Sequence, residues 1–100
     1  MRRYLVCFDI SNNRCRVKAG NILLEYGERV QESVFEVILR RAKDRRELIA
    51  RLRVLEQEPN DPDEDDVFDI RFYKLCHSCQ KQSFSLQGET IATSPATIIV

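Results

Sequence analysis

The sequence predicts a single domain of two layers, in which α-helices pack against a β-sheet. Its 100 residues suffice for one hydrophobic core and no second domain. Hydrophobic residues make up 43% of the chain and charged residues 32%, which is the balance of ordinary soluble globular proteins. Two segments whose apolar residues recur at helical spacing alternate with segments of strand composition, and this order is compatible with parallel strands one helix apart in a two-layer sandwich.

The first predicted strand covers residues 3–10 and is apolar on both faces. One face carries Leu5 and Cys7, and the other face carries Tyr4, Val6 and Phe8. A strand of this kind is typical of the centre of a sheet, where both faces are covered.

A helix is predicted to follow, from a cap at Ser11, Asn12 or Asn13 to about Tyr26. Gly27 is expected to end this helix, as glycine commonly does. The residues at helical spacing form its expected inner stripe, which comprises Val17, Gly20, Leu23, Leu24 and Gly27.

Residues 29–39 form the next predicted strand, because Val, Ile and Phe are frequent there. Because side chains alternate between the two faces of a strand, Ser33, Phe35, Val37 and Leu39 are expected on the same face. The alternative is a hairpin whose later strand runs from Phe35 to Arg40. In that case Arg29 to Glu32 would leave no room for a two-residue turn, so the pattern leaves both strand counts open.

A second helix is predicted from Asp44 to about Gln57. Asp44 and Glu47 resemble a capping box, and leucines recur at helical spacing at positions 48, 52 and 55. Residues 58–66 contain two prolines and mostly acidic side chains, which predicts a loop.

Three further strands are predicted at residues 67–75, 83–86 and 97–100. In the first of them Phe68, Ile70 and Phe72 alternate with Asp69, Arg71 and Tyr73, as in a half-buried strand. The element order is β-α-β-α-β-β-β if residues 29–39 are one strand.

Charge is distributed unevenly, although sixteen basic and sixteen acidic residues cancel over the whole chain. Residues 1–57 hold thirteen Lys and Arg against eight Asp and Glu, whereas residues 58–100 hold three against eight. The basic part is expected to attract phosphate groups, because screening over roughly 10 Å makes local charge decisive. Two solvated helix faces and one acidic loop would explain the same distribution.

No apolar run approaches the roughly 20 residues that cross a bilayer. The apolar segment before Asp9 is short and lacks the small residues of a signal-peptide cleavage site. We therefore expect a cytoplasmic protein that does not bind membranes.

The four cysteines are expected to be reduced, since Cys7 lies in an apolar strand and the chain has cytosolic character. Cys76 and Cys79 have the spacing of half a zinc knuckle, but the sequence has no second pair at that spacing. A dimer would bring two such pairs together, yet a turn with two small buried thiols explains the motif better. No zinc site is predicted.

Most enzyme templates are excluded by the residue inventory. Three glycines form no phosphate loop, and the single His77 forms no histidine pair. Asp9 remains, between an apolar strand and a helix, where an aspartate is either functional or a helix cap. Magnesium is commonly held by one or two carboxylates, water and substrate phosphates, and a two-fold dimer would supply two copies of Asp9. The basic residues expected to neutralise phosphates are Arg14, Arg16, Lys18 and Arg29.

A set of short motifs extends over nearly the whole chain. They are Phe8-Asp9-Ile10-Ser11, Arg14 with Arg16, Leu24-Glu25-Tyr26-Gly27, the run from Arg29 to Glu36, the run from Arg71 to Cys76, and the terminal Ile-Ile-Val. Together with the chain length, these motifs resemble the CRISPR-associated adaptation proteins of the Cas-two family. Phe8 departs from the pattern, because many members of that family have Tyr at this position.

The resemblance implies an α+β, ferredoxin-like β-α-β-β-α-β sandwich with an additional C-terminal strand. It also implies a homodimer joined through sheet faces, and it resolves the strand count as a long, bent hairpin. Residues 1–100 would form one domain, in which residues 76–100 are the segment exchanged between the protomers.

The resemblance assigns Asp9 as the catalytic and metal-binding residue, with magnesium or alternatively manganese as its cofactor. Arg14, Arg16 and Arg29 match basic positions of the family, while Phe8, Ser33 and Phe35 belong to its motifs. Members are associated with cleavage of single-stranded RNA or double-stranded DNA and with bridging Cas-one integrase dimers during spacer acquisition. We therefore expect a dimeric endonuclease, with a non-catalytic scaffold on duplex DNA as the alternative.

Overall fold

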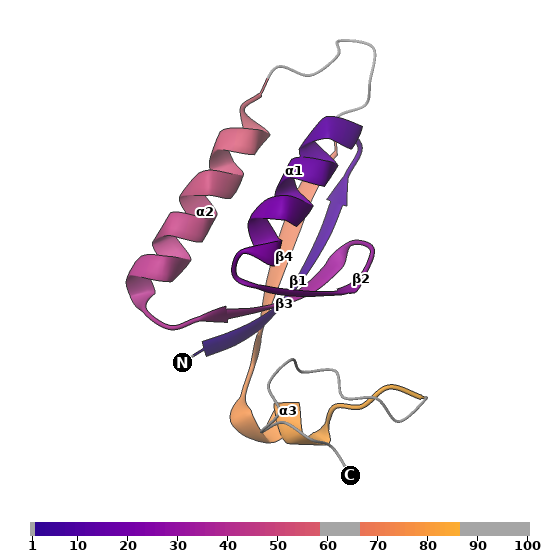
Figure 1. Ribbon diagram of the computed structural model, residues 1–100, viewed down its shortest axis with the longest axis vertical. Coiled ribbons are helices and arrows are strands. Elements are labelled where there is room, and N and C mark those ends of the chain that lie inside the picture. Colours follow the sequence, from indigo (N-terminus) through magenta and orange to yellow (C-terminus); the bar gives the residue numbers. More distant parts are fainter. Residues whose placement is uncertain (1, 59–66, 87–100) are drawn as a thin grey trace.

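The structure is a computed structural model that describes residues 2–58 and 67–86 (Figure 1). Its elements in chain order are β1 (Arg2–Ile10), α1 (Asn13–Leu24), β2 (Gly27–Gln31), β3 (Val34–Leu39), α2 (Ala42–Glu56), β4 (Phe68–Leu75) and α3 (His77–Gln82). No helix in the described part of the chain is long and apolar enough to cross a membrane.

The four strands form one antiparallel sheet in the order β2-β3-β1-β4. Helices α1 and α2 lie side by side on one face of this sheet (Figure 1). The element order and the strand order together are those of the ferredoxin-like sandwich, which confirms the expected α+β fold.

The hairpin of β2 and β3 settles the strand count. Its turn consists of Glu32 and Ser33, so the expectation that a two-residue turn has no room was wrong. Room exists because β2 begins at Gly27, where the sequence predicted only the end of a helix. The register shifts between Arg29 and Gln31, and such an irregularity bends a strand.

Strand β1 lies in the interior of the sheet, as its two apolar faces predict. The face toward the helices carries the buried residues Tyr4, Val6, Phe8 and Ile10. The opposite face, which we call the outer face, carries Leu5 and Cys7, which are half-buried, and Asp9, which is exposed.

Helix α1 confirms the capping prediction but corrects the predicted stripe. The Asn12 side chain accepts a hydrogen bond from the Cys15 backbone N–H at 3.0 Å, so Asn12 is the cap among the three candidates. Val17 and Leu24 are about half exposed, at 53% and 46%, whereas the buried face contains Cys15, Ala19, Gly20 and Leu23. Gly20 and Leu23 of the predicted stripe are therefore confirmed, whereas Val17 and Leu24 were wrong, because the buried face also runs through Cys15 and Ala19.

Helix α2 begins two residues earlier than the sequence predicted. Its cap is Arg41, and Asp44 is the third residue of the helix, where its carboxylate accepts a hydrogen bond from the Arg41 backbone N–H at 3.1 Å. Asp44 therefore contributes to a capping interaction, but not as the cap residue. The three predicted leucines, at positions 48, 52 and 55, are buried.

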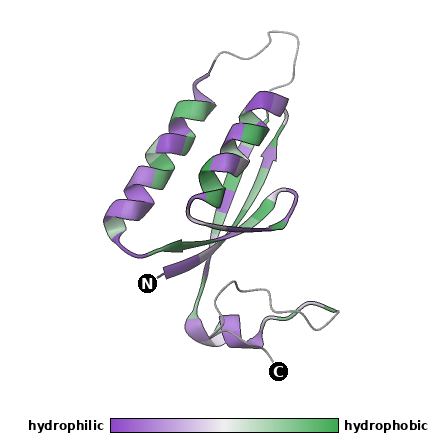
Figure 2. Ribbon diagram, viewed as in Figure 1, coloured by the Kyte–Doolittle hydropathy of each residue, from purple (hydrophilic) through white to green (hydrophobic). Residues whose placement is uncertain are grey.

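The segment after β4 differs from the sequence prediction. Cys76 and Cys79 lie at the start of α3 and are exposed, so the expectation of two buried thiols was wrong. Residues 83–86 form no strand, and the strand predicted at 97–100 lies outside the described residues. Helix α3 lies beyond the end of β4, away from α1 and α2 (Figure 1), and is largely hydrophilic (Figure 2).

Candidate functional site at the end of the first strand

Asp9 is the penultimate residue of β1 and is exposed on the outer face. The helix that follows is capped by Asn12, so the alternative in which Asp9 serves as the helix cap was wrong. Within residues 2–58 and 67–86, the Asp9 carboxylate takes part in no hydrogen bond or ion pair. Its two oxygens therefore remain accessible to a ligand.

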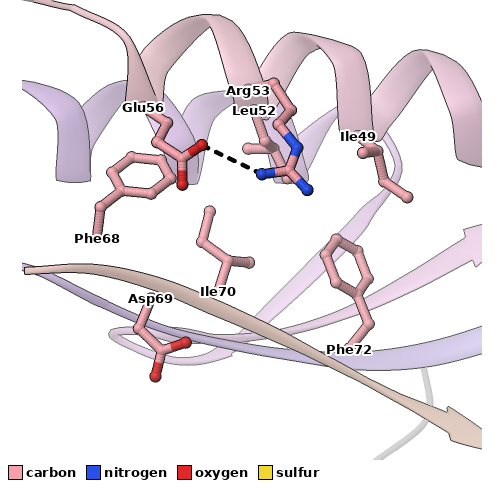
Figure 3. Close-up of a pocket in the computed structure, with 8 residues that line it drawn as sticks. All are labelled: Ile49, Leu52, Arg53, Glu56, Phe68, Asp69, Ile70 and Phe72. Carbon is pink, nitrogen blue, oxygen red and sulfur yellow. Dashed lines mark hydrogen bonds and ion pairs between the residues drawn. The ribbon is translucent and has the colours of Figure 1, made fainter.

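A second carboxylate faces Asp9 across the sheet. Asp69 of β4 is its direct partner in the antiparallel pairing, and partners of this kind have Cβ atoms about 4.5–5.5 Å apart. Figure 3 shows the Asp69 side chain pointing to the opposite side of β4 from Phe68 and Phe72. Asp69 accepts a hydrogen bond at 3.0 Å from the Arg71 guanidinium, which balances one of the two charges.

Ser11 holds the two strands together beside this pair. Its backbone N–H donates to the Val67 carbonyl at 2.9 Å, and the Val67 N–H donates to the Ser11 hydroxyl at 3.0 Å. Because these bonds lie at the end of the β1–β4 ladder, they secure the position of Asp69 opposite Asp9.

A shallow cavity of about 250 Å³ opens beside Asp9. Its lining comprises Phe8, Asp9, Ile10, Arg16, Glu32 and Ser33. Arg16 reaches this cavity from the first turns of α1, where its guanidinium also donates to the Asn13 side chain at 2.8 Å. The fold thus brings a cationic group of α1 and a carboxylate of the hairpin turn next to Asp9.

The other predicted basic residues lie elsewhere. Arg14 is exposed on α1 but does not line the cavity. Lys18 forms an ion pair with Glu58, with its Nζ 3.0 Å from the carboxylate. The Arg29 guanidinium lies over the ring of Phe35, 5.1 Å from its centroid, as in a cation–π contact.

The motif residues Phe8, Ser33 and Phe35 support the site from within the fold. The Phe8 backbone N–H donates to the Ser33 carbonyl at 3.0 Å, which links β1 to the hairpin turn one residue before Asp9. The rings of Phe8 and Phe35 stack with their centroids 5.7 Å apart. These residues therefore position the backbone that carries Asp9, and the Phe35 side chain is completely buried.

The donor set around Asp9 fits a hard divalent cation. Asp9 and Asp69 offer carboxylate oxygens on one face, and magnesium often takes only one or two protein carboxylates together with water and phosphate. The part of the chain that the structure describes has no cluster of three or more Cys, His, Asp or Glu that could hold a metal. The fit is thus to a magnesium site completed by other ligands, not to a closed structural site.

Sequence reasoning did not identify Asp69 or Glu32 as part of this site. The alternation in residues 67–75 did place Asp69 on the polar face of its strand, but pairing with Asp9 depends on strand order. Glu32 gave no local signal, because it was assigned to a strand and not to a turn.

A second cavity, of about 330 Å³, lies between α2 and β4 (Figure 3). Apolar side chains dominate its lining: Ile49, Leu52, Phe68, Ile70 and Phe72. The charged groups Arg53 and Glu56 pair with each other at 3.2 Å. Asp69 also belongs to the lining, but its side chain points to the other side of β4 (Figure 3), so the groove itself is mainly apolar.

Comparison with known proteins identifies relatives over most of the chain. A family model described as CRISPR associated protein Cas2 matches residues 1–83. The CRISPR-associated endoribonuclease Cas2 1 of Chloroflexus aurantiacus is 42% identical over 80 residues, which cover 79% of this chain and 77% of that protein. The CRISPR-associated endoribonuclease Cas2 3 of Synechocystis sp. is 35% identical over 97 residues, which cover 97% of this chain and 96% of that protein.

A solved structure is similar in fold as well as in sequence. It is a chain of a partial Cas6-RT-Cas1–Cas2 complex, with a TM-score of 0.77 and 35% identity. The similarity covers 94% of this chain and all of that chain.

Proposed function

Because this chain belongs to the Cas2 family, we propose that it acts in CRISPR adaptation as a dimeric, magnesium-dependent endonuclease. Its substrates in this proposal are phosphodiester bonds of RNA or double-stranded DNA. Two relatives are named endoribonucleases, which supports nuclease activity for this chain. The observation that carries the proposal is the exposed Asp9 carboxylate, which caps no helix and shares a cavity with Arg16.

The residues of the chain divide the work of such a reaction. Asp9 would hold the cation, with Asp69 as its neighbour across the strand pair. When bound, magnesium supplies a more acidic water and neutralises phosphate charge. The Arg16 guanidinium is placed to contact a phosphate oxygen and to stabilise the additional negative charge of the transition state. The Phe8–Ser33 hydrogen bond keeps the Asp9 backbone in position during this step.

The outer face of the sheet supports the proposed dimer. Neither α1 nor α2 covers this face, and its half-buried apolar residues include Leu5, Cys7, Val34 and Ile38. Pairing of two such faces about a two-fold axis would remove apolar surface from water. Asp9 lies on the same face, so the pairing would also bring two Asp9 carboxylates toward each other.

The second candidate is a non-catalytic scaffold that binds duplex DNA and bridges integrase dimers. The structural relative was solved as part of a complex whose name includes both Cas1 and Cas2. This name favours a role for the present chain in assembling such a complex. In this proposal Asp9 contributes to an interface and not to cleavage.

The experiment that separates the two candidates is a cleavage assay on single-stranded RNA and duplex DNA, with and without magnesium. Asp9→Asn is the informative variant, because Asn keeps the size of the side chain and removes its charge. Glu28→Gln is the matched control, since Glu28 is an exposed carboxylate of β2 outside the cavity.

The nuclease proposal requires magnesium-dependent cleavage that falls by orders of magnitude in Asp9→Asn and stays unchanged in Glu28→Gln. Melting temperature and nucleic-acid binding should remain near those of the wild type. Equal cleavage by all three proteins would contradict a catalytic role for Asp9, and trace cleavage with retained binding of DNA and integrase would favour the scaffold.

A further inference from the structure

Two thiols lie close together where the chain leaves the sheet. Cys76 directly follows β4, Cys79 belongs to the first turn of α3, and both are exposed. The Cys79 backbone N–H donates to the Cys76 Sγ at 3.3 Å, and the Ser78 hydroxyl oxygen lies 3.5 Å from the same sulfur. Side chains three residues apart in a helical turn have Cβ atoms about 5–6 Å apart, and cysteines can be bridged when their Cα atoms lie within about 7 Å. The pair therefore has the spacing of an intramolecular disulfide, although both thiols are free in this structure.

The backbone around the pair is held by hydrogen bonds that do not use the thiols. The Gln80 backbone N–H donates to the Cys76 carbonyl at 3.0 Å, and the Gln80 side chain donates to the Leu75 carbonyl at 3.1 Å. The Ser83 hydroxyl donates to the Cys79 carbonyl at 2.6 Å. Because α3 lies away from α1 and α2 (Figure 1), a bond between the two sulfurs would leave the hydrophobic core unchanged.

The two thiols are chemically unequal. Hydrogen bonds from the Cys79 and Ser78 side chains lower the pKa of the Cys76 thiol to about 7, and the contact with Cys76 raises the pKa of the Cys79 thiol. Since the thiolate is the nucleophile, Cys76 is the attacking residue and Cys79 the one that resolves the product. Such an asymmetry is typical of redox-active Cys-X-X-Cys pairs.

The surface beside Cys76 is positively charged. Cys76 lines a cavity of about 360 Å³ together with the exposed cations Arg2 and Lys74, and no carboxylate is among its described lining residues. Arg2 and Lys74 therefore favour a reaction partner that carries negative charge. Within the described residues no group of three or more Cys, His, Asp or Glu includes this pair as a metal site, so the geometry favours redox chemistry over metal binding.

We propose that Cys76 and Cys79 form a redox-active dithiol, which a small disulfide bearing carboxylates, such as glutathione disulfide, converts reversibly to an intramolecular disulfide. The Cys76 thiolate attacks one sulfur of the small disulfide, the original S–S bond breaks, and the other half leaves as a thiolate that takes up a proton. Cys79 then loses its proton to solvent and attacks the Cys76 Sγ, which displaces the second half as a thiol. The two protein thiols are oxidised and the small disulfide is reduced to two thiols, and an excess of the small thiol reverses both steps.

The first test equilibrates the full chain in mixtures of reduced and oxidised glutathione, traps free thiols with iodoacetamide and maps the peptides by mass spectrometry. The proposal predicts a disulfide between Cys76 and Cys79 whose amount follows the ratio of the two glutathione forms and is independent of protein concentration. The buried Cys15 should stay reduced, as the internal control. A disulfide that forms only between two chains, or a Cys76 that carries only glutathione at every ratio, would overturn the proposal.

The second test separates the roles of the two thiols. Cys79→Ala should stop at the mixed disulfide and accumulate one glutathionyl group on Cys76, whereas Cys76→Ala should react with glutathione disulfide many times more slowly. Ser78→Ala is the matched control, because it keeps both thiols and should still form the intramolecular disulfide. All three positions are exposed, so circular dichroism should show an unchanged fold. Equal reaction rates of Cys76→Ala and Cys79→Ala would contradict the assigned order of attack.

The third test concerns the charge of the reaction partner. The rate of disulfide formation is measured with glutathione disulfide, which is anionic, and with hydroxyethyl disulfide, which is neutral. Arg2→Gln with Lys74→Gln should slow the anionic reagent several-fold and leave the neutral one unchanged. Arg45→Gln with Arg46→Gln, on exposed α2 positions outside the cavity, should change neither rate. The same ratio of the two rates in the wild type and the cavity variant would overturn the assignment of an anionic partner.

This inference is independent of the proposed nuclease. None of the variants changes Asp9 or a residue of the cavity beside it, and the thiol measurements need no nucleic acid. Failure to cleave RNA or DNA therefore leaves the dithiol proposal intact, and failure to form the disulfide leaves the nuclease proposal intact.

Discussion

Asp9 and Asp69 are direct partners across β1 and β4, although 59 residues of sequence lie between them. Arg71 balances Asp69, whereas Asp9 has no cationic partner among the described residues. Like charges directly opposite each other destabilise a strand pair, so this arrangement carries a cost that a bound cation would relieve.

We predict that magnesium stabilises the folded protein through this pair. Addition of MgCl₂ should raise the melting temperature of the wild type, because a ligand that binds only the folded state stabilises it by mass action. The rise should be smaller in Asp9→Asn and in Asp69→Asn, as measured by calorimetry against NaCl of equal ionic strength. Identical rises in the wild type and both variants would rule out binding at this pair.

Arg16 and Lys18 should differ in their contribution to nucleic-acid binding. Both are basic residues of α1, but Lys18 is already paired with Glu58 at 3.0 Å, whereas Arg16 opens onto the Asp9 cavity. Arg16→Gln should lower the salt slope of binding by about 1, and Lys18→Gln should change it little. Fluorescence anisotropy over a salt series measures both slopes, and equal effects would show that the Glu58 pair is irrelevant to binding.

Two glycines provide a matched pair for a stability measurement. A Cβ at Gly27 would overlap the carbonyl oxygen of Glu36 and lie 2.7 Å from the Cα of Val37, so the backbone would have to move. Gly27→Ala should therefore lower the free energy of unfolding by about 3 kcal/mol.

Gly20→Ala is the control for that substitution. A Cβ at Gly20 would lie 2.8 Å from a terminal nitrogen of the Arg29 side chain, which can move aside. Alanine also favours a helix by about 1 kcal/mol over glycine, so little or no loss is expected. Chemical denaturation of both variants checks the contrast, and equal losses would contradict it.

Cys76 should be the most reactive thiol of the described chain near neutral pH. Hydrogen bonds from the Cys79 and Ser78 side chains lower the pKa of the exposed Cys76 thiol to about 7, whereas the same contact raises the pKa of Cys79. Because the thiolate is the nucleophile, alkylation of Cys76 should increase with pH through a midpoint near 7. Peptide mapping by mass spectrometry after brief iodoacetamide treatment measures this profile.

Two controls accompany the thiol measurement. Cys79→Ala removes the side-chain donor that contributes most to the lowered pKa, so the midpoint for Cys76 should move upward. Cys15 should stay unmodified in the folded protein, because burial raises the pKa of its thiol. A Cys76 midpoint that stays near 9 in the wild type would refute the prediction.

The outer face should mediate dimerisation in solution. Light scattering at micromolar concentration should give about twice the chain mass of 11.7 kDa. Leu5→Lys places a charge on this face and should yield a monomer, whereas Val54→Lys, on a helix residue already 65% exposed, should not. A monomeric wild type would also remove the shared arrangement of two Asp9 residues.

Features that depend on neighbours within about four residues could be predicted from the sequence. The two apolar faces of β1, the leucines of α2 and the set of candidate caps before α1 all express local periodicity or a local hydrogen bond. Asp9 was identifiable for the same reason, since a lone carboxylate after an apolar strand is visible in a short window.

Contacts between distant segments depended on the strand order and register of the folded sheet. Gly27 belongs to β2 because it pairs with Val37, and its hairpin has room for a turn only with that register. Asp69 joins Asp9 because β4 pairs with β1, and the pairing of residues so far apart leaves no periodic trace in either segment. Long-range pairing is chosen by the burial of the whole core against helices α1 and α2, so no local pattern specifies it.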